Sequence, residues 1–143
     1  MLPGAVNDRL MLSARFSSGE IKDYNIAAFI PITTVPQGFV LRTKLSGLSV
    51  LGLDYTARFH ESFSFTLAGA YFILSDLNTY QGMPNDRDGY FLGSEFFTRI
   101  IWSPFSDLQF IMGAGAFLPM LGNASPKSDI LWRAELTMKL AFF

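Results

Sequence analysis

Apolar and polar residues alternate in the final part of the chain, residues 129–143. From Trp132 to Phe142 every even position is apolar, whereas the odd positions from Arg133 to Lys139 are polar and carry both charge signs. A period of two over this length predicts a β-strand whose faces meet different surroundings. Strands of soluble sheets are usually shorter. A long strand with one apolar and one polar face is typical of a transmembrane barrel wall.

The same alternation recurs upstream, in the stretches 10–16, 51–59, 63–73, 90–102 and 108–118. Short joints are predicted at His60–Glu61 and at residues 103–107, where turn-forming residues gather. The pattern predicts an all-β fold, an antiparallel meander of six to eight long strands. We expect this meander to form a transmembrane β-barrel or the C-terminal part of one.

The connections between these strands also alternate in length. Those at 60–61 and 103–107 are short, and those at about 75–88 and 119–128 are long and polar. Outer-membrane barrels have short turns at the periplasmic end and long loops outside. We therefore expect the last strand to run from the external side to the periplasmic side.

Residues 19–46 allow two interpretations. They form one long external loop, or a further hairpin that brings Arg42 and Lys44 to the polar face. In the hairpin the outward residues are Tyr24, Ile26, Ala28, Ile30, Phe39, Leu41 and Leu45. Six strands is the preferred count and eight the alternative. The difference matters because eight tilted strands close a small barrel.

Composition narrows the class further. The 143 residues suggest a single domain, 1–143, rich in Phe and with no cysteine, which excludes disulfides and thiolate metal sites. A net charge of −1 without a basic run argues against a nucleic-acid partner. The charge-free runs 24–41 and 108–126 are broken by Pro and Gly, so no transmembrane helix is expected. The first residues lack the features of a signal peptide. We therefore expect a mature form, an artificial start, or the C-terminal part of a larger barrel.

Charged residues occupy the polar positions of the predicted strands. The residues expected to face the lumen are Arg15, Asp54, Arg58, Glu95, Arg99, Arg133, Glu135 and Lys139. One interpretation is an ion-pair network that braces or closes the interior. The other is a path on which the basic excess favours anionic solutes.

Aromatic residues gather at the predicted strand ends, on the apolar parity. The expected girdle residues are Phe59, Phe63, Tyr71, Tyr90, Trp102, Trp132 and Phe142. Rings that are apolar in body suit both membrane interfaces. The alternative is a soluble core rich in Phe.

Catalytic and metal-binding patterns are weak, so we predict no enzyme activity, no cofactor and no metal site. His60 stands in a predicted turn without a nucleophile motif nearby. The run from Asn85 to Gly89 lacks the spacing and the distal Glu of a calcium loop. Gly113 and Gly115 lie inside a strand, where glycine indicates a bend or a close approach.

Two motifs carry a resemblance to a known family. The stretch 93–102 has a Gly-x-Glu strand, and 113–119 reads Gly-x-Gly-x-Phe-x-Pro. Together they resemble the last hairpins of Gram-negative outer-membrane barrels, most closely the alginate-export and porin-like type. The resemblance covers residues 47–143. It implies an outer-membrane location and lipid as a partner.

The C-terminal residues resemble the sorting signal that the barrel-assembly machinery reads, which implies that machinery as a second partner. The signal residues are Leu136, Met138, Leu140, Phe142 and Phe143. Phe142 shares the outward parity and Phe143 does not, so the signal is shifted by one residue.

Three functions fit these patterns. The preferred one is a porin-like outer-membrane barrel, or a fragment of one, that gives passive passage to small anionic solutes. An alternative is a self-contained eight-stranded barrel with a closed lumen, acting as a structural anchor or adhesin. A second alternative is a soluble barrel that binds a hydrophobic ligand, which requires an apolar interior and a polar exterior.

Overall fold

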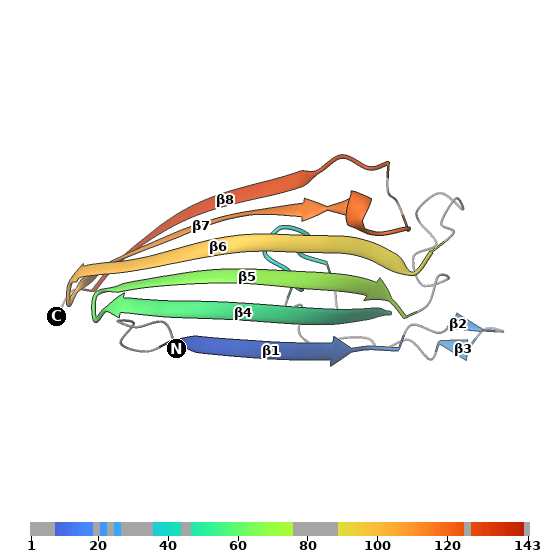
Figure 1. Cartoon of the computed structure of the whole chain (residues 1–143), viewed down its shortest axis with the longest axis horizontal. Helices are drawn as coiled ribbons and strands as arrows, with labels where there is room; N and C mark the ends of the chain where they lie inside the picture. Colours follow the sequence, from blue (N-terminus) through green and yellow to red (C-terminus); the bar gives the residue numbers. More distant parts are fainter. Residues whose placement is uncertain are drawn as a thin grey trace.

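A computed structural model describes residues 8–18, 21–22, 25–26, 36–43, 47–75, 89–124 and 127–141. Six strands form one antiparallel sheet in the order β1-β4-β5-β6-β7-β8 (Figure 1). Their bounds are β1 Arg9–Phe16, β4 Leu48–His60, β5 Phe63–Leu74, β6 Phe91–Phe105, β7 Leu108–Leu118 and β8 Leu131–Leu140. The predicted all-β meander is confirmed, and its sheet has six strands among the described residues.

The sheet is curved but is not closed into a barrel. Strands β1 and β8 are its two edges, and each pairs with one neighbour only, β4 and β7 respectively. One face of the sheet is concave. Side chains from β1, β4, β6 and β8 line a common hollow on this face. The opposite face is convex. The short turns lie at one end of the sheet, as expected, at the left in Figure 1.

The first predicted short joint is shifted by one residue, and the second is shorter than the sequence indicated. His60 is the last residue of β4 and pairs with Phe63, so the turn consists of Glu61 and Ser62. Strand β6 continues through Pro104 to Phe105, which leaves only residues 106–107 as the second turn. An irregular register between Trp102 and Phe105 accommodates the proline, which cannot donate to the ladder.

The region 19–46 adds no strand to the main sheet among its described residues. Strands β2 (Ile21–Lys22) and β3 (Asn25–Ile26) pair only with each other. The segment 36–43 lies against the concave face, behind the sheet in Figure 1. The hairpin alternative is therefore wrong for Phe39 and Leu41, which turn inward. Tyr24, Ala28, Ile30, Lys44 and Leu45 lie outside the described residues.

The hydrophobic core lies on the concave side, toward the end with the long connections. Its buried members are Leu48, Val50, Phe72, Leu74, Phe117 and Ala124. Phe72 and Phe117 meet edge to face, with ring centroids 5.9 Å apart. Val40 and Leu41 pack on this core from the segment 36–43. A polar interior was predicted, and the structure adds this apolar cluster to it.

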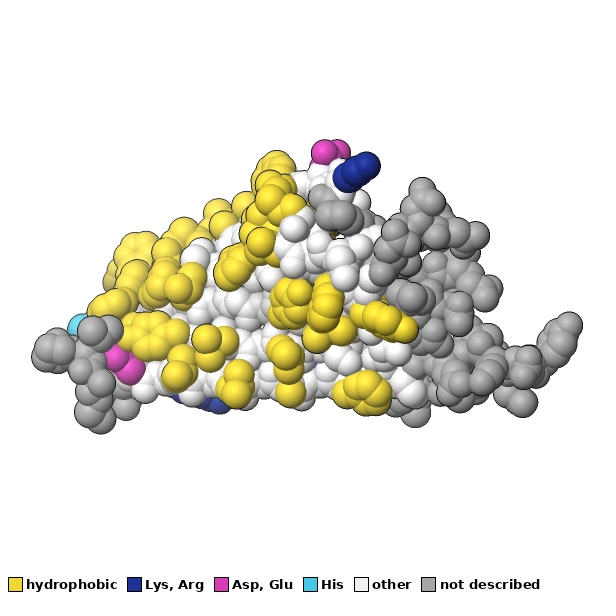
Figure 2. Space-filling view, turned by 45° about the vertical axis from the view of Figure 1, so that its right-hand side comes forward, with side chains coloured by type: hydrophobic (Ala, Val, Ile, Leu, Met, Phe, Trp, Pro, Cys, Tyr) yellow, Lys and Arg dark blue, Asp and Glu magenta, His cyan; other side chains and the backbone are white. Residues whose placement is uncertain are grey.

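The convex face carries large apolar side chains that the chain itself leaves exposed. Leu12, Trp132 and Leu136 are 79%, 78% and 73% exposed. Figure 2 shows hydrophobic side chains spread over this face, with the charged side chains in view at its rim. Among the described residues, no helix is long and apolar enough to span a membrane.

Candidate functional site: a basic cavity on the concave face

The cross-strand register places all eight predicted lumen-facing charges on one face of the sheet. Asp54 stands in a row with Met11 and Ala68, and Arg99 stands with Thr66 and Gly113. Arg133, Glu135 and Lys139 follow the same parity on β8. Because this parity faces the segment 36–43, the concave face is the charged one. The alternation alone was sufficient to predict this arrangement.

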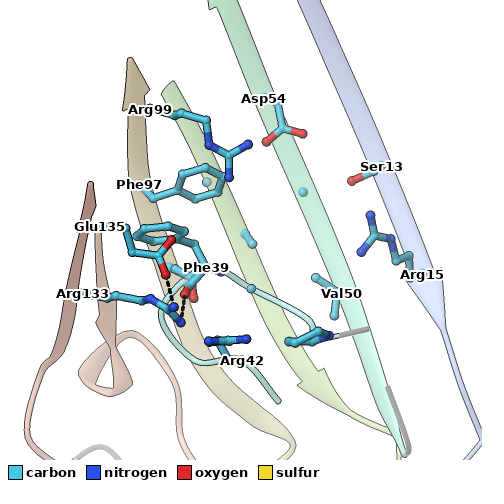
Figure 3. A pocket seen from close by; sticks show the side chains of 16 residues that line it. Ser13, Arg15, Phe39, Arg42, Val50, Asp54, Phe97, Arg99, Arg133 and Glu135 are labelled. Carbon is cyan, nitrogen blue, oxygen red and sulfur yellow. Dashed lines mark hydrogen bonds and ion pairs between the residues drawn. The ribbon is translucent and has the colours of Figure 1, made fainter. Parts of the chain in front are cut away.

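A cavity of about 450 Å³ lies between the segment 36–43 and the concave face. Four arginines line it, three from the sheet and Arg42 from the segment. The remaining charged side chains of its lining are Asp54, Glu95 and Glu135. Figure 3 shows Arg15, Arg99 and Arg133 pointing toward one space from β1, β6 and β8, so both edge strands of the sheet contribute to it. The cavity thus collects most of the predicted charged residues.

Glu95 holds the segment 36–43 against the sheet. Its side chain is fully buried. One carboxylate oxygen accepts a hydrogen bond from the backbone N–H of Phe39 at 2.5 Å. The other accepts from Val40 and Leu41 at 3.0 and 2.9 Å. Successive backbone N–H groups form a concave site for an anion, so a buried carboxylate is well satisfied there.

The approach of the segment to Glu95 requires glycine at position 38. Gly38 has φ +82°, and a Cβ there would lie 2.7 Å from a carboxylate oxygen of Glu95. A side chain would therefore be strained by its backbone and blocked by its neighbour. Sequence reasoning treated Gly38 only as a loop residue, because its partner stands 57 positions away in the chain.

Two aromatic rings stack in the cavity wall. Phe39 and Phe97 lie with centroids 5.3 Å apart, and their planes are inclined by 22°. Gly113 and Gly115 leave the room for them, since a Cβ at Gly115 would lie 2.6 Å from the Cβ of Phe97. The structure confirms the predicted close approach at these two glycines, where the side chains of Phe39 and Phe97 come near the backbone. The inward position of Phe39 was missed.

The charged groups of the cavity are unequally paired. Arg133 forms an ion pair with Glu135 and donates to the backbone oxygen of Phe39 at 3.4 Å (Figure 3). Arg15 donates to the side-chain oxygen of Gln37 at 2.6 Å. Within the part of the chain that the structure describes, no hydrogen bond or ion pair engages the side chains of Arg42, Arg99 or Asp54. Arg99 lies over the ring of Phe97, 5.8 Å from its centroid.

Arg58 and Lys139 lie outside this cavity. Arg58 lines a second hollow of about 510 Å³ toward the short-turn end, together with Arg9 and Gln109. It donates to the backbone oxygen of Glu61 at 3.2 Å. Lys139 stands opposite Gln109 at the same end. His60, the last residue of β4, is hydrogen-bonded to Ser62 of the turn at 2.8 Å.

The predicted girdle residues with described positions occur at the two ends of the convex face. Phe59, Phe63 and Trp102 lie at the short-turn end, where Phe63 pairs with Trp102 across the sheet. Tyr71 and Trp132 lie toward the other end on the same parity. Tyr90 is exposed just before β6. Their role at a membrane interface stays a prediction.

Of the predicted assembly signal, Leu136, Met138 and Leu140 lie on the convex parity of β8 and are exposed. Phe142 and Phe143 lie outside the described residues. So does most of the run from Asn85 to Gly89.

Within the described ranges, no group of three His, Asp or Glu side chains is placed to hold a metal ion. The arrangement offers guanidinium groups and aromatic faces, which suit the binding of small anions, and the unpaired carboxylate of Asp54 opposes such binding. No protein-family model, curated protein or solved structure matches the chain.

Proposed function

We propose that this chain forms part of the wall of an outer-membrane β-barrel of a Gram-negative-type bacterium. In this proposal the convex face contacts lipid, and the concave face lines a porin-like path for small anionic solutes. The observation that carries the proposal is the separation of the faces. Every Asp, Glu, Lys and Arg of the six strands stands on the concave parity.

The exposed convex face supports lipid as its partner. Leu53, Phe96 and Met138 are 50%, 50% and 63% exposed, and similar residues continue across all six strands. Contiguous apolar surface of this extent marks an interaction site or a membrane contact. A soluble barrel for a hydrophobic ligand would place the charges outside and the apolar residues inside. The described strands instead place their charges on the concave face, beside its apolar core, and large exposed apolar side chains on the convex face.

The unpaired edge strands of the sheet support the proposal that this chain forms part of a barrel wall and not a whole barrel. Strands β1 and β8 each leave one row of backbone N–H and C=O groups without a strand partner among the described residues. Such groups cannot stay unpaired in a hydrocarbon environment. In the proposal, further strands pair with both edges, from the same polypeptide or from another chain.

The charge balance of the concave face supports a preference for anions. Its basic side chains are Arg9, Arg15, Arg42, Arg58, Arg99, Arg133 and Lys139. Its acidic side chains are three carboxylates on the strands, Asp54, Glu95 and Glu135, and Asp8 and Glu61 beside the second hollow. Two of the three carboxylates are already engaged by backbone N–H groups or by Arg133. A confined surface with excess positive charge raises the local concentration of anions.

The test is the ion preference of the chain, together with whatever strands complete its barrel, in planar lipid bilayers. With a KCl gradient across the bilayer, the proposal predicts a reversal potential of the sign given by chloride preference. The variant Arg99→Glu should shift it toward cations. Lys127→Glu makes the same charge change outside the sheet and should not shift it. Cation preference of the unmodified protein, or equal behaviour of both variants, would refute the anion path.

A second candidate function is favoured by the segment 36–43. This segment contacts both edge strands, because Arg15 of β1 reaches Gln37 and Arg133 of β8 reaches the backbone of Phe39. It therefore crosses the concave face and occupies part of the interior. A barrel blocked in this way would serve as a structural anchor or adhesin. Heat-modifiable gel mobility of the chain as a monomer, with no conductance, would favour this function.

A further inference from the structure

Arg42 combines two unusual features. Its φ is +48°, and among the described residues no other residue except glycine has a positive φ. This backbone region is unfavourable for side chains with a Cβ, and non-glycine residues held there often mark functional positions. The side chain of Arg42 lines the 450 Å³ cavity and has no hydrogen-bond or ion-pair partner within the described ranges. Nothing in the local fold requires arginine at this position.

The backbone around Arg42 is fixed from both sides. The three N–H groups of residues 39–41 bind the buried carboxylate of Glu95. Gln37 and Thr43 exchange backbone hydrogen bonds of 2.7 and 3.1 Å, which close the segment into a loop. Arg42 lies between these two anchors. Its guanidinium is therefore presented to the cavity by a rigid support, as a binding group requires.

The charge of the cavity is not balanced by its own carboxylates. Glu95 is satisfied by the segment backbone, and Glu135 is paired with Arg133. Asp54 points toward Arg99 across the cavity in Figure 3. Four arginines of the lining thus face three carboxylates, Arg42 pairs with none of them within the described ranges, and Arg15 donates to the neutral amide of Gln37. An anion from outside would complete the site.

We propose that this cavity binds a small carboxylate and that Arg42 is its principal contact. The guanidinium fork donates two parallel hydrogen bonds to the two oxygens of a carboxylate, which gives both affinity and geometric selection. The stacked rings of Phe39 and Phe97 provide an apolar surface for a short carbon skeleton. The cavity has the size of a small-molecule site, which limits the ligand to a few carbon atoms or a small ring.

In a barrel, the proposed path would select its solutes at this site. That role rests on the proposed function. The binding itself does not need a pore. It is measured on the full chain in detergent micelles, by titration calorimetry with succinate as the probe and with succinamide as its uncharged counterpart.

The unmodified chain should bind succinate saturably and bind succinamide at least about 10-fold more weakly, as expected for a charge-assisted pair. Arg42→Gln should weaken succinate binding by about 10-fold or more. Lys127→Gln removes the same charge elsewhere and should leave the affinity unchanged. The circular dichroism of each variant should show unchanged β structure.

Arg42→Gly separates binding from folding. Glycine adopts the positive φ without strain, so this variant should be at least as stable as the parent chain and should still lose succinate binding. Absence of saturable succinate binding by the unmodified chain would overturn the proposal, as would full binding by Arg42→Gly. Succinate binding without conductance would refute the proposed anion path but support the binding site. Conductance without succinate binding would refute the binding site but not the path.

Discussion

The two faces of the sheet are formed by alternate residues of the same strands, and yet their side chains have different surroundings. The convex face is apolar and gains almost no cover from the rest of the chain, so Leu136 and Trp132 are left mostly exposed. The concave face has the charges, and it holds a segment of its own chain through Glu95. The difference indicates that the sheet was built for two different surroundings. The exposed convex side fits the proposal that lipid covers it, and the concave side is organised by contacts within the chain.

The first way to sharpen this comparison is to truncate one phenylalanine on each face. Phe72 is fully buried in the concave core, whereas Phe96 is 50% exposed on the convex face. Phe72→Ala should lower the free energy of unfolding by about 4 kcal/mol, because a cavity remains in packed surroundings. Phe96→Ala should cost about 1 kcal/mol, since on the proposed lipid-facing side lipid would fill the space. Urea titrations in lipid vesicles, followed by tryptophan fluorescence, measure both. Equal losses would contradict the difference between the faces.

The second comparison introduces one charge on each face of β4. Leu53→Arg places a guanidinium on the convex face and should cost about 3 kcal/mol of stability in a bilayer, as charged residues on the lipid face do near the midplane. Thr56→Arg places it on the concave face, where Arg58 and Asp54 already stand, and should cost under about 1 kcal/mol. Flotation with vesicles and refolding yield give the measurement. Equal tolerance of both variants would refute a lipid-facing convex side.

The third comparison stays on the concave face and concerns its two glutamates. Glu95 is fully buried and accepts three backbone hydrogen bonds. Glu95→Gln should lower the free energy of unfolding by about 2 kcal/mol, because an amide presents one acceptor where a carboxylate presents two. Glu135→Gln disturbs a more exposed ion pair with Arg133 and should cost under about 1 kcal/mol. Proteolysis should also reach the segment 36–43 faster in Glu95→Gln. Equal cleavage rates would mean that Glu95 does not hold the segment.

The smallest expected effect distinguishes two glycines. A Cβ at Gly115, on the concave face, would lie 2.6 Å from Phe97, whereas a Cβ at Gly69, on the convex face, would meet its nearest neighbour at 3.5 Å. Gly115→Ala should cost about 1.5 kcal/mol through overpacking. Gly69→Ala should be neutral within about 0.5 kcal/mol. The midpoints of urea unfolding report the difference, and a stable Gly115→Ala variant would show that the ring stack has room to move.

The strands and their facing could be predicted from the sequence because a period of two requires no knowledge of tertiary contacts. Asp54 and Arg99 were assigned to the polar face by parity alone, and the register places them there. The ends of the strands were less predictable. Pro104 suggested a turn, but a bulge allows β6 to continue past it.

The organisation of the concave side could not be predicted in the same way. Glu95 was recognised as an inward charge, but its partners are backbone groups of residues 39–41, which carry no sequence signature. Phe39 was outward only in the hairpin alternative for residues 19–46, and neither interpretation foresaw that its ring stacks on Phe97. Gly38 and Gly115 became interpretable only after their distant neighbours were known.

The most direct test of the account is the environment of consecutive residues on β4. The chain has no cysteine, so single-cysteine variants at positions 51 to 56 can each carry one spin label in lipid vesicles. If the convex face contacts lipid, collisions with oxygen, which is enriched in lipid, should be frequent at 51, 53 and 55. Collisions with a water-soluble nickel complex should be frequent at 52, 54 and 56. The reverse alternation, or access of the nickel complex to every position, would contradict a convex face in contact with lipid.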